Sequence, residues 1–349
     1  GCTLVLEDIT ERKRYVRNME FLARTAMELV DLPAEANIYE YIAERIIELV
    51  PGSFVFTDSY DENSHHFTMQ AVKGGDLREW VIGVLGRDPI GLAFPVLELF
   101  TAPRYETTQT MFGIREYIFR PEEKKGAYSL YDVCLHQIPE DICEAVLDRY
   151  NIGKCYGIGL VWRDQLFGYI GVFLPPEEEL HDREAFESFI RQASIAIARR
   201  QTEERLRRSE RRLREVIESS PHAAALIDAG GRYTLLNRRF TDLFGYTLED
   251  IPTGTEWFNR AFPDEQKRRE AIAAWHSDLE GAARGEAGPR TFLVRCRDGA
   301  EKAALFRSVG LCDGTHYVTC EDVTEERRAY GVLVDEIAAL RRQLASHSP

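Results

Sequence analysis

The sequence predicts an α+β protein in which two folded domains are joined by long charged helices. Segments with helical spacing of apolar residues alternate with short strand-like runs bounded by turn residues. A chain of 349 residues is long enough for two or three domains of ordinary size. A stretch near the start also reappears near the end: residues 7–16 read EDITERKRYV and residues 321–330 read EDVTEERRAY. Internal repeats of this kind indicate modular construction.

Each copy of the repeat follows a β-type run, Cys2–Leu6 in one case and His316–Cys320 in the other. The second copy closes a complete domain. The first copy predicts that residues 1–9 are the last strand of a domain whose body lies upstream. The sequence does not begin with Met, which agrees with a chain cut from a longer array of domains. In each copy the strand is expected to pass into a helix at an Asp and a Thr, residue types that can cap the start of a helix. These exit residues are Asp8, Thr10, Asp322 and Thr324.

Each exit leads into a helix, predicted at residues 10–34 and 326–349. Apolar residues recur at alternating spacings of three and four, which is the pattern of a coiled-coil seam. The first series is Val16, Met19, Ala23, Ala26 and Val30, and the second is Tyr330, Leu333, Ile337, Leu340 and Leu344. Aligned on the repeat, both helices keep one heptad phase. We expect a coiled-coil homodimer, and the alternative is two amphipathic helices that each pack on their own domain.

Residues 35–200 are predicted to form the first whole domain. A helix comes first, then two strands, a long mixed region, a hairpin and a closing helix from about Asp182. The expected strands are 53–58, 67–72, 155–162 and 166–174, with Arg163-Asp164-Gln165 as the hairpin turn. This order suits an antiparallel sheet with helices on one face.

A charged linker helix, residues 201–217, is predicted to join this domain to the next. Eight arginines and five glutamates fall within residues 199–218. Such a run either binds an anionic partner or forms a solvated helix with ion pairs four residues apart, and we favour the second.

Residues 218–325 are predicted to form the second domain. Strands at 223–228 and 233–237 precede a group of helices, and strands at 291–297, 302–311 and 316–322 follow. The last two strands meet at Asp313-Gly314, a strong signal for a tight hairpin.

Composition and motifs exclude several functions. A net charge of −14 and a pI near 5.2 argue against nucleic-acid binding. No uninterrupted run of 18 apolar residues exists that would span a membrane. Seven cysteines without metal-ligand spacing indicate reduced thiols in a cytoplasmic protein. The sequence contains no phosphate-binding loop, no HExxH motif and no phosphoacceptor-histidine helix, so we expect no enzyme activity in this chain.

The second domain resembles a PAS domain over its whole length. The resemblance rests on Leu226-Ile227-Asp228, Asn237 with Phe240, Phe244-Gly245-Tyr246, Arg297-Asp298-Gly299 and the exit Glu321-Asp322-Val323-Thr324. By the repeated exit, residues 1–9 similarly resemble the end of another PAS domain. The Gly-x-Asn-Cys-Arg-Phe stretch of flavin-binding PAS domains is not present.

Residues 35–200 resemble a GAF domain through their layout of helices and strands. The asparagine-lysine signature of nucleotide-binding GAF domains and the Cys-His of bilin-binding ones are not present. Together the resemblances imply the input region of a sensor of the histidine-kinase type, as found in bacteria and methanogenic archaea. A ligand, redox change or partner would act on the GAF or PAS core. Dimeric helices would then carry the signal through the exit residues to a downstream kinase or other output domain.

Three alternatives remain open from the sequence. The chain is a dimerisation scaffold without ligand, or a haem-based redox or gas sensor acting through the GAF domain, with iron held by His or haem by a Cys thioether. The third alternative is an enzyme whose active site lies in the insertion at 98–137, where the available acids and bases are Glu106, Glu116, Asp132 and His136. We expect no cofactor and a colourless protein.

The candidate binding residues fall into two groups. The expected PAS cavity is lined by Asn237, Phe240, Phe244, Trp275, Phe292, Val294, Cys296 and Phe306, with residues 292, 294 and 296 on one strand face. The GAF candidates are Cys134, His136 and Cys143, although each cysteine, like Cys155, also fits a small packed hydrophobe. His276 occupies the helix where haem-binding PAS domains keep their iron ligand. It is expected on the surface, because Trp275 and Leu279 mark the buried face.

Overall fold

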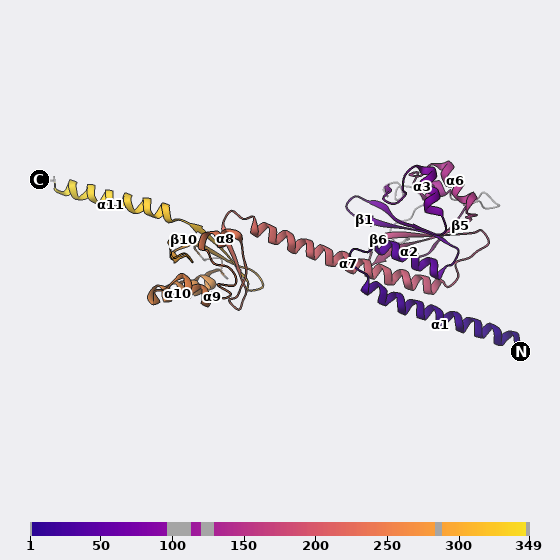
Figure 1. The fold of residues 1–349 in the computed structure, drawn as a ribbon, viewed down its shortest axis with the longest axis horizontal. Coiled ribbons are helices and arrows are strands. Elements are labelled where there is room, and N and C mark those ends of the chain that lie inside the picture. The colour runs from indigo at the N-terminus through magenta and orange to yellow at the C-terminus, as the bar shows by residue number, and fades with distance from the viewer. Residues whose placement is uncertain (1, 96–112, 120–128, 283–287, 347–349) are drawn as a thin grey trace. The chain divides into compact units, whose positions relative to one another are not determined.

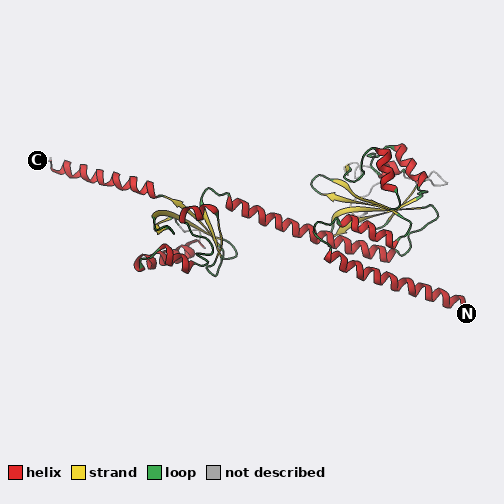
Figure 2. Cartoon of the chain, in the orientation of Figure 1, coloured by secondary structure: helices red, strands yellow, loops and turns green. Residues whose placement is uncertain are grey.

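The computed structural model describes residues 2–95, 113–119, 129–282 and 288–346. The chain divides into two compact units, Gly1–Arg205 and Leu206–Pro349. Figure 1 traces the chain by residue number, and Figure 2 distinguishes its helices from its strands. No helix in the described ranges carries an apolar stretch long enough to cross a bilayer.

An antiparallel sheet forms the centre of the first unit. Its strands, where the structure describes them, lie in the order β3-β2-β1-β6-β5-β4. Their bounds are β1 Phe54–Asp61, β2 His66–Lys73, β3 Ala93–Pro95, β4 Arg115–Ile118, β5 Lys154–Trp162 and β6 Gln165–Leu174. The predicted β5–β6 hairpin is present, and its turn residues Arg163 and Asp164 take positive φ angles of 50° and 63°.

Helices cover both faces of this sheet, whereas the sequence predicted helices on one face (Figure 1). Three helices cover one face: α1 Cys2–Asp31, α2 Ile38–Leu49 and the first part of α7 Arg183–Glu218. Against the other face lie α3 Leu77–Leu85, α5 Leu130–Val133 and α6 Glu140–Arg149. The physical reason lies in the strands. In β1, Val55 and Phe56 are both apolar and point to opposite faces, so both faces require a cover.

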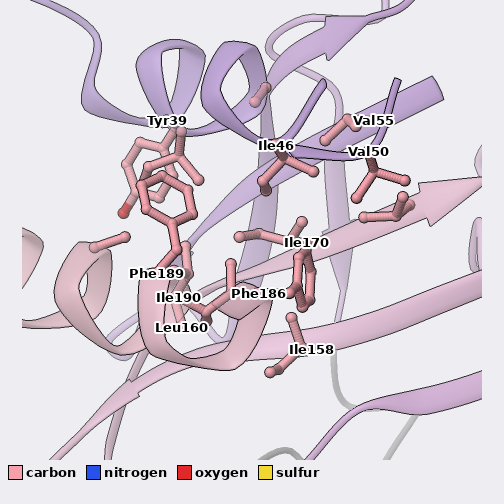
Figure 3. Packing of buried hydrophobic residues seen from close by; sticks show 14 of the residues in the cluster. Tyr39, Ile46, Val50, Val55, Ile158, Leu160, Ile170, Phe186, Phe189 and Ile190 are labelled. Atoms are coloured by element: carbon pink, nitrogen blue, oxygen red, sulfur yellow. The ribbon is translucent and has the colours of Figure 1, made fainter. Parts of the chain in front are cut away.

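The core between the sheet and α2 and α7 is mainly apolar (Figure 3). Ile46 of α2, Ile170 of β6 and Phe186 of α7 have no exposed surface. Phe21 of α1 reaches the same core and packs edge-on against Phe189, with ring centroids 5.4 Å apart. Continuous α7 contains both the predicted closing helix and the predicted linker helix.

The N-terminus differs from its prediction. Residues 2–6 belong to helix α1 and do not form a strand, so Asp8 and Thr10 lie inside a helix and not at a strand exit. A strand needs a neighbouring strand to bond its backbone, and the described residues provide none there, whereas a helix bonds its own backbone. The exit geometry is therefore seen only at the second copy of the repeat.

The second unit contains a curled antiparallel sheet with the order β8-β7-β11-β10-β9 in the described residues. Its strands are β7 Ala223–Ile227, β8 Tyr233–Leu236, β9 Arg290–Arg295, β10 Glu301–Gly310 and β11 His316–Asp322. The helices are α8 Arg238–Phe244, α9 Gly254–Ala261, α10 Glu265–Ala282 and α11 Thr324–Ser346. These elements follow the order that the sequence predicted, including the hairpin at Asp313-Gly314.

Candidate functional site

The first unit holds a cavity of about 140 Å³ between the sheet and helices α3, α5 and α6. Strand side chains, among them Phe56, Met69 and Phe173, form its floor, and Val81 and Val146 reach it from the helices. An engineered apolar cavity of about 150 Å³ takes up benzene. The space therefore suits a ligand of one ring or a short branched chain.

Two glycines make room for this floor. A Cβ at Gly157 would lie 1.8 Å from the hydroxyl oxygen of Tyr169, and one at Gly171 would lie 2.0 Å from the Phe56 ring. Any side chain there would collide, so glycine lets both rings lie flat over the sheet. The Tyr169 hydroxyl then lies 3.2 Å from that of Tyr117 on β4.

Asp58 is the one carboxyl group in the described wall of this cavity. It lies on β1 at an irregularity in the pairing with β2, opposite Met69 and Tyr169. The residue is only 7% exposed, and its Oδ1 has no hydrogen-bond partner among the described residues. Burial raises the pKa of the Asp58 carboxyl to about 8, which favours the protonated form at neutral pH.

The sequence analysis missed Asp58. An available signal was strand alternation, because Phe56 and Asp58 are two residues apart and therefore share a face. An acid at the end of an apolar run reads more simply as the start of a turn, and β1 continues instead to Asp61.

The structure separates the three predicted GAF candidates. Cys134 and Cys143 line the cavity, whereas His136 lies outside it. The Cys143 thiol donates to the carbonyl of Ile138 at 3.7 Å, and hydrogen bonding to Cys143 together with burial raises the pKa of Cys134. A thiol held protonated is a weak nucleophile. His136 is half exposed, stacks on Tyr131 and lies 3.2 Å from an oxygen of Asp132.

The acids and bases of the proposed catalytic insertion do not converge in the described residues. Glu116 accepts a hydrogen bond from Tyr156 at 3.0 Å, on a different element from the Asp132–His136 pair. Glu106 lies outside the described residues. The described parts of the chain contain no group of three or more His, Cys, Asp or Glu placed to hold a metal ion.

The second unit holds a smaller cavity of about 70 Å³. Half of the predicted lining residues form its wall: Phe240, Trp275, Phe292 and Phe306. Further wall residues were not predicted, among them Tyr233, Trp257, Phe258, Phe262, Ser308, Val318 and Cys320. Strand alternation was an available signal for Val318 and Cys320, because polar Thr319 lies between them on β11.

The other four predicted residues lie outside this wall. Phe244 packs edge-on against Phe240 and Trp257, and Val294 has no exposed surface. The Cys296 thiol turns away to the carbonyl of Leu243, at 3.6 Å.

Asn237 has a structural position instead of a ligand-facing one. Its Oδ1 accepts from the backbone N–H groups of Ala224 and Phe240 at 2.8 and 2.9 Å, and so caps helix α8. Its Nδ2 donates to the carbonyls of Ile217 and His222 at 3.0 and 2.9 Å. The amide has no capacity left for a ligand.

Neither cavity, as formed, fits a haem. The macrocycle is several times larger than a benzene ring, and neither described wall includes a histidine. His276 is exposed, in agreement with the helix phase, while Trp275 reaches the cavity.

The exit from β11 into α11 is tied to the sheet. Asp322 Oδ1 accepts from the backbone N–H of Thr324 at 3.0 Å, and the Thr324 hydroxyl accepts from the N–H of Ala303 on β10 at 2.9 Å. Lys302 pairs with the second Asp322 oxygen at 3.4 Å. The first turn of the helix is thus fixed to two neighbouring strands.

Residues 217–328 match the sequence model of a family described as the PAS fold. Among solved structures, the PAS domain of an HTR-like protein from Haloarcula marismortui has 21% identity and a TM-score of 0.26, covering 35% of this chain and 98% of its own. A domain of a sensory box sensor histidine kinase/response regulator from Geobacter sulfurreducens has 20% identity and a TM-score of 0.27, with 34% and 96% covered. A cyanobacteriochrome GAF domain has 15% identity and a TM-score of 0.31, with 48% and 94% covered. No curated protein matches the chain.

Proposed function

We propose that this chain, whose residues 217–328 have a PAS fold, is a sensory segment that couples its two cavities to the helices leaving each unit. One observation carries the proposal. Strand β11 contributes Val318 and Cys320 to the cavity wall and passes directly into helix α11 through Asp322 and Thr324. A change in what fills the cavity therefore acts on the strand from which the helix begins.

The first unit supports the same coupling by a different route. Its cavity and its long helices lie on opposite faces of one sheet, so the strands are the shared element. The Arg200 guanidinium of α7 donates to the carbonyls of Leu32 and Ala36, at 2.8 and 2.9 Å, and so joins α7 to the end of α1. A shift of the sheet would move these helices together.

We further propose that the helices pair with those of a second copy of the chain. The predicted seam of α1 leaves Val16, Met19 and Val30 between 44% and 65% exposed, while Phe21, Leu22 and Leu29 on another face pack into the core. On α11, Leu333 and Ile337 are 58% and 44% exposed. Apolar side chains with heptad spacing and no intramolecular cover fit a homodimeric coiled coil.

On this proposal the chain itself is not an enzyme, and its output is a kinase or other domain reached through α11. A ligand-free dimerisation scaffold would have the same helices but would not respond to its cavities. The proposal is therefore tested at the step from cavity to helix.

The test is hydrogen exchange in residues 324–332 after Val318→Ala, which enlarges the second cavity. The matched control is Thr319→Ala, the next residue on β11, which points to the opposite face. We expect faster exchange at the start of α11 in Val318→Ala and little change in the control. Equal loosening of α11 and of α8 in both variants would reject the coupling, because it would report only a general loss of stability.

A further inference from the structure

We propose that the cavity of the first unit binds a small apolar amine, whose ammonium group forms an ion pair with Asp58. The proposal rests on the sensory function above and deepens it by naming the chemical class of the ligand. It begins from a carboxyl group that the fold buries in an apolar cavity and leaves with an unpartnered oxygen.

A buried polar group without a hydrogen bond destabilises a protein, and a buried charge without a partner does so more strongly. Asp58 lies among Phe56, Met69 and Tyr169, where valine or isoleucine would fill the space without such a cost. The neighbouring strand residue Thr57, by contrast, has its hydroxyl bonded to the Tyr39 carbonyl at 3.2 Å. A ligand that donates a hydrogen bond to the Asp58 carboxyl would remove this unfavourable contribution to the stability of the folded protein.

The groups facing Asp58 favour a cation over an anion. The other polar groups of the wall come from both layers. They are the Cys134 thiol just after α5, the Cys143 thiol of α6, the Tyr169 hydroxyl of β6, and Tyr117 and Arg115 of β4. Arg115 interacts with Tyr117, and burial alone accounts for the raised pKa of Asp58. Among the described residues no cation forms an ion pair with the Asp58 carboxyl, and an ammonium group would supply one.

The size and lining of the cavity set the rest of the ligand. A volume of about 140 Å³ admits a single ring or a branched chain of a few carbons. The wall around Asp58 is mostly aliphatic and aromatic, with contributions such as Val72, Leu77 and Phe94. A highly polar ligand would leave most of its groups unpaired there.

Binding has a defined proton balance. At neutral pH, below its pKa of about 8, Asp58 without a bound cation is mostly the neutral acid, and a simple alkylamine in water is protonated. When the ammonium enters, the Asp58 O–H bond breaks, the proton leaves to solvent, and an N–H···O⁻ hydrogen bond forms. One proton is released for each amine bound, which distinguishes this mode from binding of a neutral molecule.

The site is also placed to report its occupancy. The carbonyl of Asp58 would lie only 2.0 Å from a Cβ at Gly168, so the two backbones pack closely. The adjacent Phe167 carbonyl accepts from the Tyr39 hydroxyl at 2.9 Å, and Tyr39 lies on α2 across the sheet. A shift of the Asp58 backbone would therefore reach α2 through the packing contact with Gly168 and the hydrogen bond between Phe167 and Tyr39.

The test is calorimetric titration of the whole chain at neutral pH with isobutylamine and benzylamine, beside isobutanol and benzyl alcohol as neutral matches. Phosphate and HEPES buffers, which differ in ionisation enthalpy and contain no primary amine, measure the protons released. We expect each amine to bind about tenfold more tightly than its alcohol, with one proton released. Asp58→Asn should remove this preference and the proton release, yet leave the weak binding of the alcohols unchanged.

Asp132→Asn is the matched control, since Asp132 is a half-exposed carboxylate outside the cavity wall. It should bind both amines as the wild type does. Binding of neither amine at millimolar concentration, no proton release, or wild-type amine binding by Asp58→Asn would each overturn the proposal. Proton release by the wild type decides the matter even if the variant fails to fold.

The outcomes also separate this inference from the sensory function. Amine binding without any change in hydrogen exchange of α2 or α7 would leave the site standing and reject the coupling. An effect of Val318→Ala on α11 without any amine binding would support the coupling and reject the amine site.

Discussion

Asp58 and Asn237 are both buried polar side chains, and they differ in how completely the protein satisfies them. Asn237 makes four hydrogen bonds to backbone groups of three different segments, and Asp58 leaves one oxygen unpartnered among the described residues. Full satisfaction identifies a residue that holds the fold together. An unpartnered group in a cavity identifies a residue whose partner is expected from outside.

Asn237→Ala is expected to destabilise the second unit by about 3 kcal/mol. It removes a helix cap, leaves the buried N–H of Ala224 without its side-chain partner, and takes one hydrogen bond each from the carbonyls of Ile217 and His222. Urea denaturation followed by tryptophan fluorescence measures the loss. Thr234→Ala, which removes a weaker exposed bond of 3.3 Å to Leu226, is the control and should cost well under 1 kcal/mol. A loss below about 1 kcal/mol in Asn237→Ala would show that the network is not structural.

Asp58→Asn is expected to stabilise the first unit increasingly as pH rises. The folded protein keeps a proton on Asp58 up to pH of about 8, whereas the unfolded chain loses it near 3.8. Between these values the folded state binds more protons, so wild-type stability falls by about 1.4 kcal/mol per pH unit from this group. The variant lacks that loss. Its advantage over the wild type, measured by denaturation, should grow by about 3 kcal/mol from about pH 5 to about pH 7. A difference that stays constant with pH would place the pKa of Asp58 near its ordinary value.

Spacing along a helix or strand gave the face of a residue but not its place in the cavity wall. Phe240 and Phe292 line the second cavity, whereas Phe244 and Val294, chosen by the same spacing, lie outside its wall. Asn237, which carries part of the PAS resemblance, was assigned to the same cavity. Its amide turns instead toward the end of α7 and the start of β7, a tertiary contact that no local pattern encodes.

At the scale of elements, helix α1 carries two apolar faces, and the sequence analysis found only one. Phe21, Leu22 and Leu29 pack into the core, and the predicted seam with Val16 and Met19 stays exposed. A search for heptad spacing finds the narrow stripe of the coiled-coil seam. It does not find the second apolar stripe, in which Leu22 and Leu29 each lie one position before a seam residue. The helical state of residues 2–6 was missed for a related reason. Strand propensity is read locally, but a strand forms only beside a partner.

The junction between β11 and α11 gives a prediction at this scale. Asp322→Ala removes the hydrogen bond to the Thr324 N–H and the ion pair with Lys302, at a cost of about 1 kcal/mol. We expect faster hydrogen exchange in residues 324–332 with the rest of the second unit unchanged. Asp313→Ala is the matched control, since it removes the same kind of bond, to Thr315 at 2.9 Å, from the turn at the other end of β11. Unchanged exchange at the start of α11 would mean that the aspartate does not anchor the helix.

At the scale of the whole molecule, the chain repeats one scheme in two units of different topology. Each unit places a small apolar cavity on one side of an antiparallel sheet, and each is continuous with a long helix that exposes apolar side chains. The fold class could be predicted from the sequence, because turns, breaks and periodicity are local. The complete wall of either cavity could not, because its residues come from strands and helices far apart in the chain.

The pairing of two chains is the prediction that belongs to this scale. Leu333→Asp combined with Ile337→Asp places two carboxylates in the exposed apolar seam of α11, where a second copy would have to bury them. We expect a dimer for the wild type in sedimentation velocity and a shift of the variant toward monomer, with a dissociation constant raised by at least about a hundredfold. Ala339→Asp is the control, because it adds one carboxylate to the same helix about 140° away from the seam. If the control weakened association as strongly, general charge repulsion would explain the effect. If the wild type sedimented as a monomer at micromolar concentration, the exposed stripes of α1 and α11 would need another occupant. A dimer lost only in the seam variant would mean that a signal reaching Asp322 acts on a helix held in register by its partner.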